Sequence, residues 1–255
     1  MKLRSYTLVG DIAVINLKSE EELEEARKLA VDIAGRSPSI KSVYAKLGTE
    51  TEFRVAKLIY LWGERRTCTI AREYGVDLIV DIAKAYYNPR LAGERRRIAE
   101  RVSDGETVLD MFCGVGGFTL HIACLRNCVI YANDINRSAV EMLVQSIARN
   151  RRRVKSSIYI LNIDSRRLPE VIGGVLFDRI IMDNPTKPLD SMDASYKLVK
   201  GNGIIHLYFL SNKQREREVV DEVLKRYPGL RERSVEEVYE YSPSKSIYRA
   251  DFIRV

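Results

Sequence analysis

The chain of 255 residues is long enough for one large domain or two modest ones, and its content of 45% hydrophobic and 30% charged residues is ordinary for a globular protein. No window approaches the roughly 18 consecutive apolar residues of a membrane span. The N-terminus, Met1-Lys-Leu-Arg-Ser-Tyr6, lacks the apolar core and cleavage site of a signal peptide. These absences exclude a helical membrane protein and predict a cytoplasmic one.

The cysteines and histidines do not have the spacing of a metal site. The 4 cysteines contain no C-x-x-C pair, and only 2 histidines are present, His121 and His206. A structural zinc site needs four such ligands, usually in closely spaced pairs. We therefore expect buried structural thiols and no metal.

Residues 1–87 predict a small α+β domain. A capped stretch with acids in its first turn predicts a helix at 19–34, which Gly35 and Pro38 end. Runs rich in β-branched and aromatic residues predict strands around it, at 6–9, 12–17, 42–46, 55–61, 66–70 and 76–81. Residues 88–102 then predict a turn and a basic helix that connects this domain to the rest.

From residue 106 onward, predicted strands and helices alternate. The strands lie at 107–112, 129–132, 158–162, 178–182 and 203–210, and helices follow them at 117–125, 137–150, 168–172, 190–199 and 212–226. Such alternation indicates a parallel sheet with helices on both faces. A final pair of strands, 236–242 and 248–254, adds the antiparallel edge typical of class I methyltransferases. The predicted fold is therefore α/β, a Rossmann-like class I methyltransferase domain at 88–255 behind the small α+β domain.

The first of these alternating strands ends in a glycine-rich turn. The apolar run 107–112 includes Asp110, and Gly114, Gly116 and Gly117 follow it. Glycines let the backbone approach a ligand closely and adopt positive φ, and the start of a helix leaves free N–H groups. The dinucleotide pattern G-x-G-x-x-G is not met, because the third glycine is missing.

Acidic residues follow several of the predicted parallel strands. Asp134 follows the second strand, where a carboxylate can hold the hydroxyls of a ribose. Because ligands of open α/β sheets bind outside the carboxyl ends of the strands, we expect one pocket beside Asp110, Asp134, Asp164 and Asp183. Several carboxylates suit a ligand with sulfonium and ammonium groups, which predicts an S-adenosylmethionine site. The alternative for each aspartate is a helix cap.

The net charge of +7 is gathered in clusters. One cluster, at 147–155, includes Arg151, Arg152 and Lys155; a second includes Arg90 and Arg95, and a third is the pair at 166–167. Charge runs usually mark solvated faces. Three of them on one modest chain indicate a nucleic-acid-binding surface.

Several motifs occur in a fixed order along the chain. They are Asn88-Pro-Arg-Leu-x-x-Glu-Arg95, Val108-Leu-Asp-Met-Phe-x-Gly-Val-Gly116, Ala132-x-Asp-Ile-Asn136, the turn at Pro185, Gly203-Ile-Ile-His-Leu-Tyr208 and Tyr241-Ser-Pro243. Upstream stand Gly10-Asp-Ile-Ala-Val14 and Thr51-Glu-Phe-Arg-Val-Ala-Lys57. Together they resemble the archaeal and eukaryotic tRNA (guanine-37-N1)-methyltransferase family over essentially the whole chain. The resemblance implies a monomeric enzyme acting on the tRNA anticodon loop, in a short form without the family's extra N-terminal domain.

The resemblance also implies roles for individual residues. Glu94 matches the family's general base, which takes the N1 proton of guanine, and Arg54 matches an arginine that stabilises charge at O6. Arg90 and Arg95 would contact RNA or help position Glu94. The S-adenosylmethionine contacts would come from Asp110, Phe112, Gly114, Gly116, Asp134, Ile135, Asp164 and Asp183. Without the motif, Glu94 would be interpreted as a salt-bridged surface residue.

One turn departs from the family pattern. The family has Asn-Leu-Pro after the fourth strand, whereas this chain has Asp183-Asn184-Pro185. A turn of this kind still suits the planar amide edge of a base, so all three residues are catalytic candidates. Asp183 can accept from N1–H or from the exocyclic amine, reinforcing or replacing Glu94.

Other functions stay open. A wyosine precursor at position 37 is an alternative substrate, either for methyl transfer or for the aminocarboxypropyl transfer of the sister family; Arg90 and Pro185 favour methyl transfer. A non-catalytic RNA-binding protein is disfavoured by the intact Asp110, Gly114 and Asp134. A nicotinamide oxidoreductase is disfavoured by the missing third glycine.

Overall fold

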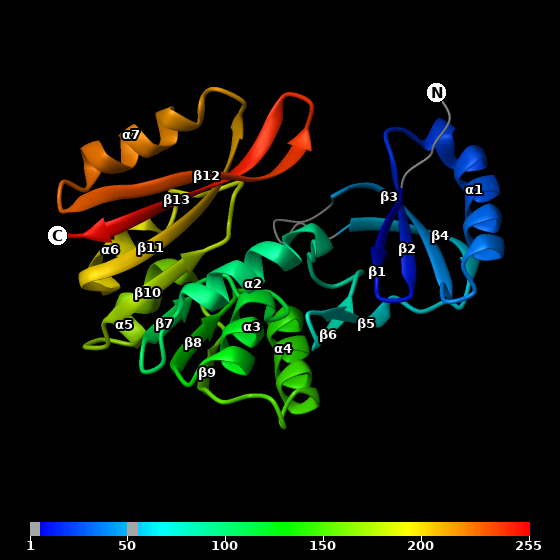
Figure 1. The fold of residues 1–255 in the computed structure, drawn as a ribbon. Coiled ribbons are helices and arrows are strands. Elements are labelled where there is room, and N and C mark those ends of the chain that lie inside the picture. The colour runs from blue at the N-terminus through cyan, green and yellow to red at the C-terminus, as the bar shows by residue number, and fades with distance from the viewer. Residues whose placement is uncertain (1–5, 50–55) are drawn as a thin grey trace.

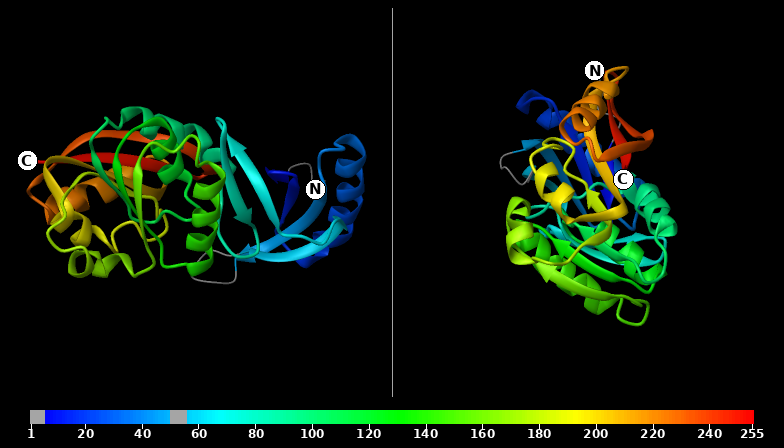
Figure 2. Two further views of the ribbon diagram at one scale, coloured as in Figure 1. Left: turned by 90° about the horizontal axis from the view of Figure 1, so that it is seen from below. Right: turned by 90° about the vertical axis from the view of Figure 1, so that its left-hand side faces the viewer.

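The computed structural model describes residues 6–49 and 56–255. Figure 1 shows two lobes, a smaller one from the N-terminal part of the chain and a larger one from the rest. The lobes lie end to end, which makes the molecule elongated (Figure 2, left). Across the described ranges, no helix is both long and apolar enough to cross a membrane.

The smaller lobe is a four-stranded sheet covered on one face by a helix. Strands β1 (Tyr6–Val9), β2 (Ile12–Leu17), β3 (Ser42–Thr49) and β4 (Ala56–Gly63) are ordered β1-β2-β3-β4. Between β2 and β3, which are parallel, the chain passes through the short 3-10 turn η1 (Glu20–Glu22) and helix α1 (Leu23–Arg36). The apolar face of α1 buries Ala26, Ala30 and Ile33 against Ile15 and Val43 of the sheet, as its helical period requires.

A hairpin of β5 (Cys68–Glu73) and β6 (Val76–Asp81) stands apart from both main sheets and docks on the larger lobe. There it packs mainly on helix α4 (Arg137–Arg149), and polar side chains of α4 and of Asn150, just after it, satisfy the free edge of β6. The Asn150 amide donates to the Asp77 carbonyl at 2.7 Å and accepts from the Asp77 N–H at 3.1 Å, and the Ile79 N–H donates to Ser146 Oγ at 2.8 Å. An unpaired strand edge is thereby used as a docking surface.

The larger lobe is a seven-stranded sheet in the order β12-β13-β11-β10-β7-β8-β9. Its strands are β7 (Thr107–Asp110), β8 (Val129–Asn133), β9 (Ser157–Leu161), β10 (Phe177–Met182), β11 (Val199–Asn212), β12 (Leu230–Ser242) and β13 (Lys245–Arg254). The first five run parallel, and β12 and β13 form an antiparallel edge. The helices are η2 (Pro89–Leu91), α2 (Ala92–Arg101), α3 (Gly117–Leu125), α4, η3 (Ser165–Arg167), α5 (Leu168–Val171), α6 (Met192–Leu198) and α7 (Glu216–Arg226).

Alternation along the central strands sends side chains into two separate cores. Ile180 and Met182 of β10 enter one core with residues of α5, α6 and α7, whereas the intervening Ile181 enters the other with Ile98 of α2 and Phe118 of α3. Successive strand residues point to opposite faces, so helices cover both sides (Figure 1). The predicted fold class is confirmed.

Some element boundaries differ from the prediction. The last pair of strands was expected at 236–242 and 248–254, but β12 begins at Leu230. Its extra residues include Arg231 and Glu232, which do not resemble a buried strand; they pair with β13 because an edge strand needs to bury only one face. The predicted domain boundary at residue 87 stays a prediction, since the β5–β6 hairpin lies between the two sheets.

Candidate functional site

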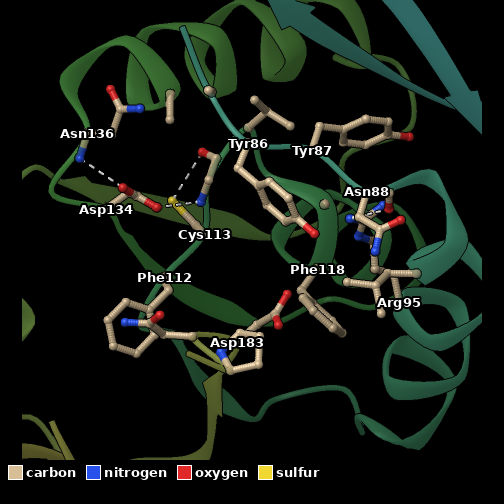
Figure 3. Close-up of a pocket in the computed structure, with 18 of the residues that line it drawn as sticks. Tyr86, Tyr87, Asn88, Arg95, Phe112, Cys113, Phe118, Asp134, Asn136 and Asp183 are labelled. Atoms are coloured by element: carbon tan, nitrogen blue, oxygen red, sulfur yellow. Dashed lines mark hydrogen bonds between the residues drawn. The ribbon is translucent and has the colours of Figure 1, made fainter. Parts of the chain in front are cut away.

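A cavity opens at the carboxyl ends of β7, β8 and β10, where an α/β sheet binds its ligands. Figure 3 shows side chains converging on it from the loops after these strands and from the segment before α2. Among the predicted site residues, its lining includes Arg95, Phe112, Gly114, Asp134, Ile135, Asp183, Asn184 and Pro185. Tyr86, Tyr87 and Asn88 close it on the side of the small lobe.

The glycine turn after β7 is fixed by close packing. Gly116 has φ +94°, and a Cβ there would lie 2.4 Å from Leu143 Cδ1. At Gly117 a Cβ would lie 2.4 Å from Arg95 Nε, so this glycine lets the arginine pass over the start of α3. Gly114 has φ +52° and open space beside its Cα. Gly114 is therefore the glycine whose backbone is open to a ligand, whereas Gly116 shapes the turn.

Asp110 lies at the end of β7, fully buried, and falls outside the described cavity lining. Its Oδ2 accepts from the Thr119 N–H at 3.0 Å and the Thr119 hydroxyl at 2.7 Å. Burial raises its pKa to about 7; the Thr119 hydrogen bonds oppose this rise, and the nearby charge of Asp183 adds to it. The side chain of Asp110 thus caps the first turn of α3. This is the helix-cap role given above as the alternative for each strand-end aspartate.

Asp134 organises the side of the cavity next to the glycine turn. Its two oxygens accept from the N–H groups of Gly114 and Asn136, each at 2.8 Å. Burial raises the pKa of Asp134, although these two backbone bonds oppose the rise. The neighbouring Ile135 is exposed by 51% on the rim. A fixed carboxylate with remaining lone pairs beside an apolar rim fits a ribose and an adenine ring.

The turn Asp183-Asn184-Pro185 forms the opposite wall. The Leu210 N–H donates to the Pro185 carbonyl at 2.9 Å, and the Lys187 N–H donates to the Asn184 carbonyl at 3.1 Å. These bonds fix the turn to β11 and to its own loop. In Figure 3, Asp183 points into the cavity from below and Tyr86 from above. Asp183 is therefore placed to contact a ligand in the cavity directly.

Glu94 lies behind this cavity rather than in its described lining. Its side chain is 2% exposed and accepts from the Tyr208 hydroxyl at 2.8 Å. The guanidinium groups of Arg249 and Arg97 also pair with it. The tilted contact of Tyr208 with Phe118, which lines the cavity, has ring centroids 5.5 Å apart. Glu94 is thus salt-bridged, as the interpretation without the motif expects, but it is buried and not on the surface.

Arg95 is also buried, and its partners come from the hairpin and from the segment just before α2. Its guanidinium pairs with Glu73, donates to the Asn88 carbonyl at 3.1 Å and lies 5.1 Å from the centroid of the Tyr87 ring. Glu73 also accepts from the Tyr87 hydroxyl and lies 3.0 Å from His121 Nε2. Burial would raise the pKa of Glu73, but His121, Arg95 and Tyr87 together hold it below its ordinary value.

Glu73, which pairs with Arg95, and His121, which pairs with Glu73, were not identified as site residues from the sequence. The available signal was weak: Glu73 is an acid at the end of an otherwise alternating strand, and His121 is a histidine inside an apolar helix. Neither pattern indicates what the residue contacts, because Glu73 and Arg95 are 22 positions apart.

The remaining predicted site residues are dispersed. Arg90 lines a wider cleft between the lobes, together with Lys46, Tyr239 and Tyr241. This cleft shares Tyr86, Tyr87 and Asn88 with the cavity. The side chain of Asp164 caps η3 and pairs with Arg166. Arg151, Arg152 and Lys155 are exposed in and after the turn that follows α4, and Arg54 lies outside the described residues.

Comparison with known proteins identifies the family. A model of the TRM5/TYW2 methyltransferase domain matches residues 69–238, and a model of the TYW2 N-terminal domain matches residues 2–67. The chain belongs to the TRM5/TYW2 methyltransferase family. The resemblance found in the sequence motifs is confirmed, and the family models divide the chain just before the hairpin.

Relatives with known names support the same assignment. The chain is 40% identical over 205 residues to the tRNA (guanine(37)-N(1))-methyltransferase Trm5b of Methanocaldococcus jannaschii. This match covers 80% of this chain and 58% of that relative. It is 27% identical over 224 residues to the tRNA 4-demethylwyosine(37)-methyltransferase Taw21 of Saccharolobus solfataricus, covering 87% and 84%. A solved complex of aTrm5 and tRNALeu superimposes with a TM-score of 0.85 at 33% identity, covering 98% and 72%.

The buried Glu73–Arg95 pair predicts an acid-sensitive stability. Glu73→Gln leaves the guanidinium buried without its counter-charge, so the free energy of unfolding should fall by about 3 kcal/mol at neutral pH. Because the folded pKa of Glu73 lies below its ordinary value, its contribution is complete above about pH 4.3 and is lost as pH falls through the folded pKa.

Urea unfolding of both proteins at neutral and acidic pH measures this difference, which should narrow in acid. Glu170→Gln is the control, because Glu170 pairs with Arg167 at 3.5 Å and is 72% exposed. A Glu73→Gln effect as small as that of the control would contradict the prediction.

Proposed function

We propose that the protein transfers a methyl group from S-adenosylmethionine to N1 of guanine 37 in tRNA. The observation that carries this proposal is the 40% identity to Trm5b over 205 residues, in a chain whose glycine turn and Asp183–Pro185 turn line one cavity. The match spans little more than half of that relative's length. The activity and substrate of this chain are therefore part of the proposal. The solved complex of a related protein with tRNALeu supports tRNA as the substrate class.

The cofactor fits the Asp134 side of the cavity. Asp134 would accept from the ribose hydroxyls through the lone pairs that Gly114 and Asn136 leave free. Phe112 and Ile135 offer apolar surface for the adenine ring. S-adenosylmethionine supplies the electrophilic methyl group; this chain's residues orient the base and remove its proton.

Glu94 is the general base in this proposal. Guanine N1–H is a weak acid, and a carboxylate at hydrogen-bond distance takes its proton as the methyl group arrives. Because Glu94 now pairs with Arg97, that pair has to open when RNA binds. Asp183 already faces the cavity and is the competing base. Arg54 is assigned charge stabilisation at O6 on the family motif alone.

The cleft between the lobes is where the tRNA would lie. Arg90 and Lys46 supply cationic groups, and Tyr241, which is 52% exposed, supplies a stacking surface at the rim. Phosphate contacts supply affinity without sequence preference, and aromatic rings stack on unpaired bases. A flipped guanine could pass between Tyr86 and Asn88 into the cavity, since both residues line both spaces.

Methylation of the wyosine precursor at position 37 is a second candidate. It is supported by the match to Taw21, which extends over 84% of the length of that relative. In addition, Asp183 replaces the family's asparagine at the wall that would meet the base. A tricyclic base presents a different donor edge from guanine, so an acceptor carboxylate there suits it as well.

Cofactor binding can be tested at Asp134. Asp134→Ala removes two charge-assisted bonds to ribose and should weaken S-adenosylhomocysteine binding at least about 10-fold in calorimetry. Glu141→Ala is the control, since Glu141 is an exposed acid on α4 paired with Arg137. Unchanged affinity in Asp134→Ala, or a preference of the wild type for NAD, would contradict the assignment.

The substrate can be tested with three tRNAs that differ at position 37, followed by nucleoside mass spectrometry. Unmodified tRNA carrying guanine 37 should yield 1-methylguanosine, and the same tRNA with adenine 37 should yield no product. Activity only on tRNA carrying 4-demethylwyosine would favour the second candidate. Appearance of an aminocarboxypropyl adduct would overturn methyl transfer altogether.

The base can be tested by amide substitutions. Glu94→Gln should lower the single-turnover rate about 100-fold or more while leaving tRNA and cofactor affinity nearly intact, because a general base acts in the transition state. Asp183→Asn, which restores the family residue, should keep most of the rate. The reverse pattern would identify Asp183 as the base.

A further inference from the structure

The motif Gly203-Ile-Ile-His-Leu-Tyr208 places two buried polar side chains on one face of β11. His206 and Tyr208 are two residues apart and therefore point to the same side of the sheet, toward the core that includes Tyr208, Ile98 of α2 and Phe118 of α3. Buried polar groups are costly unless they are paired. Both are paired, and the pairing leads to Glu94.

The path begins at His206. Arg179 Nη1 lies 2.7 Å from His206 Nε2, and His206 Nδ1 lies 2.6 Å from Asp251 Oδ1. Because a guanidinium can only donate, Nε2 accepts and Nδ1–H donates to Asp251. Burial lowers the pKa of His206, and the hydrogen bond to Asp251 opposes this. The neutral imidazole of His206 therefore donates a hydrogen bond to Asp251 and fixes the orientation of that carboxylate.

Asp251 in turn orients Arg249. The Arg249 Nε donates to Asp251 Oδ1 at 2.8 Å, and its Nη2 lies 2.8 Å from Glu236 Oε1. The guanidinium is fully buried, and its remaining Nη1 pairs with Glu94 Oε1. The Tyr208 hydroxyl donates to the same oxygen at 2.8 Å. Burial and the charge of Glu94 hold the pKa of Tyr208 well above its ordinary value, so it stays a donor.

The two oxygens of Glu94 therefore have unequal surroundings. Oε1 is held by Tyr208 and Arg249, which are both fully buried. Oε2 pairs with Arg97, whose side chain is 50% exposed. An exposed guanidinium can turn toward an RNA phosphate at little cost, whereas a buried one cannot leave.

We propose that Tyr208 and Arg249 are positioning residues for Glu94: they fix Oε1 and leave Oε2 to receive the N1 proton once Arg97 turns away. This rests on the proposed function. In the step, the electron pair of the N1–H bond stays on N1 and bonds to the methyl carbon. The carbon–sulfur bond of the donor breaks with its pair on sulfur, and the proton passes to Oε2.

Tyr208→Phe tests this without creating a cavity. The variant loses one of the two donors that hold Oε1, so the carboxylate can rotate away from the orientation that presents Oε2 to the N1 proton. The single-turnover rate should therefore fall about 10-fold. Affinities for tRNA and S-adenosylhomocysteine should not change.

Other charged groups near Glu94 could also affect this rate. The groups that face it are Arg97 on its own helix, Tyr208 from β11 and Arg249 from β13, with Glu236 and Asp251 behind Arg249 and Asp183 in electrostatic range of Tyr208. Introducing Tyr208→Phe into an Asp183→Asn background separates the effect of the Asp183 charge from that of the lost hydroxyl. The loss of rate caused by Tyr208→Phe should be the same in both backgrounds.

Tyr227→Phe is a matched control, because the Tyr227 hydroxyl donates to Asp193 Oδ1 at 2.7 Å in a similar tyrosine–carboxylate bond far from the cavity. Its single-turnover rate should match that of the wild type. If both tyrosine variants lower the rate alike, or if Tyr208→Phe keeps the wild-type rate while Glu94→Gln is inactive, the positioning role is wrong and the base assignment stands. Normal turnover in Glu94→Gln would instead remove the base assignment itself.

Discussion

Helix α2 turns two oppositely charged neighbours, Glu94 and Arg95, toward the protein interior, and each is neutralised by a residue from a distant part of the chain. Arg95 pairs with Glu73 of the hairpin, and Glu94 pairs with Arg249 of the last strand. A charge buried without a partner costs several kcal/mol. The helix can therefore take its position only when the hairpin and the antiparallel edge of the sheet are both in place.

This constraint explains how the cavity keeps its shape. Arg95 reaches its partner by passing over Gly117, where a Cβ would collide with its guanidinium stem. The same guanidinium donates to the Asn88 carbonyl and lies beside Tyr87, two residues that line both the cavity and the interlobe cleft. The hairpin and helix α2 thus meet at one buried ion pair, and part of the cavity wall is built from residues that contact this pair.

The sequence predicts the parts of this arrangement that depend on local pattern. Alternating apolar runs, glycines and strand-end acids were sufficient for the fold class and for a pocket lined by Gly114, Asp134 and Asp183. The same patterns could not separate Asp134 from Asp110 and Asp164, because a strand-end aspartate can face a ligand or cap a helix with little change in backbone. Partners such as Arg249 and Glu94, 155 positions apart, leave no local signal at all.

The charges of α2 also separate into an inner and an outer set. Glu94 and Arg95 are buried, whereas Arg90 just before the helix and Arg97 within it are exposed. An RNA phosphate would be attracted by the outer set, and drawing Arg97 outward removes a positive charge from beside Glu94. That change would free Oε2 of the carboxylate at the moment the substrate arrives. Part of the binding energy of the phosphates would then be used to separate Arg97 from the general base Glu94. A free nucleobase without its flanking sugar-phosphate backbone should therefore be a poor substrate even if it fits the cavity.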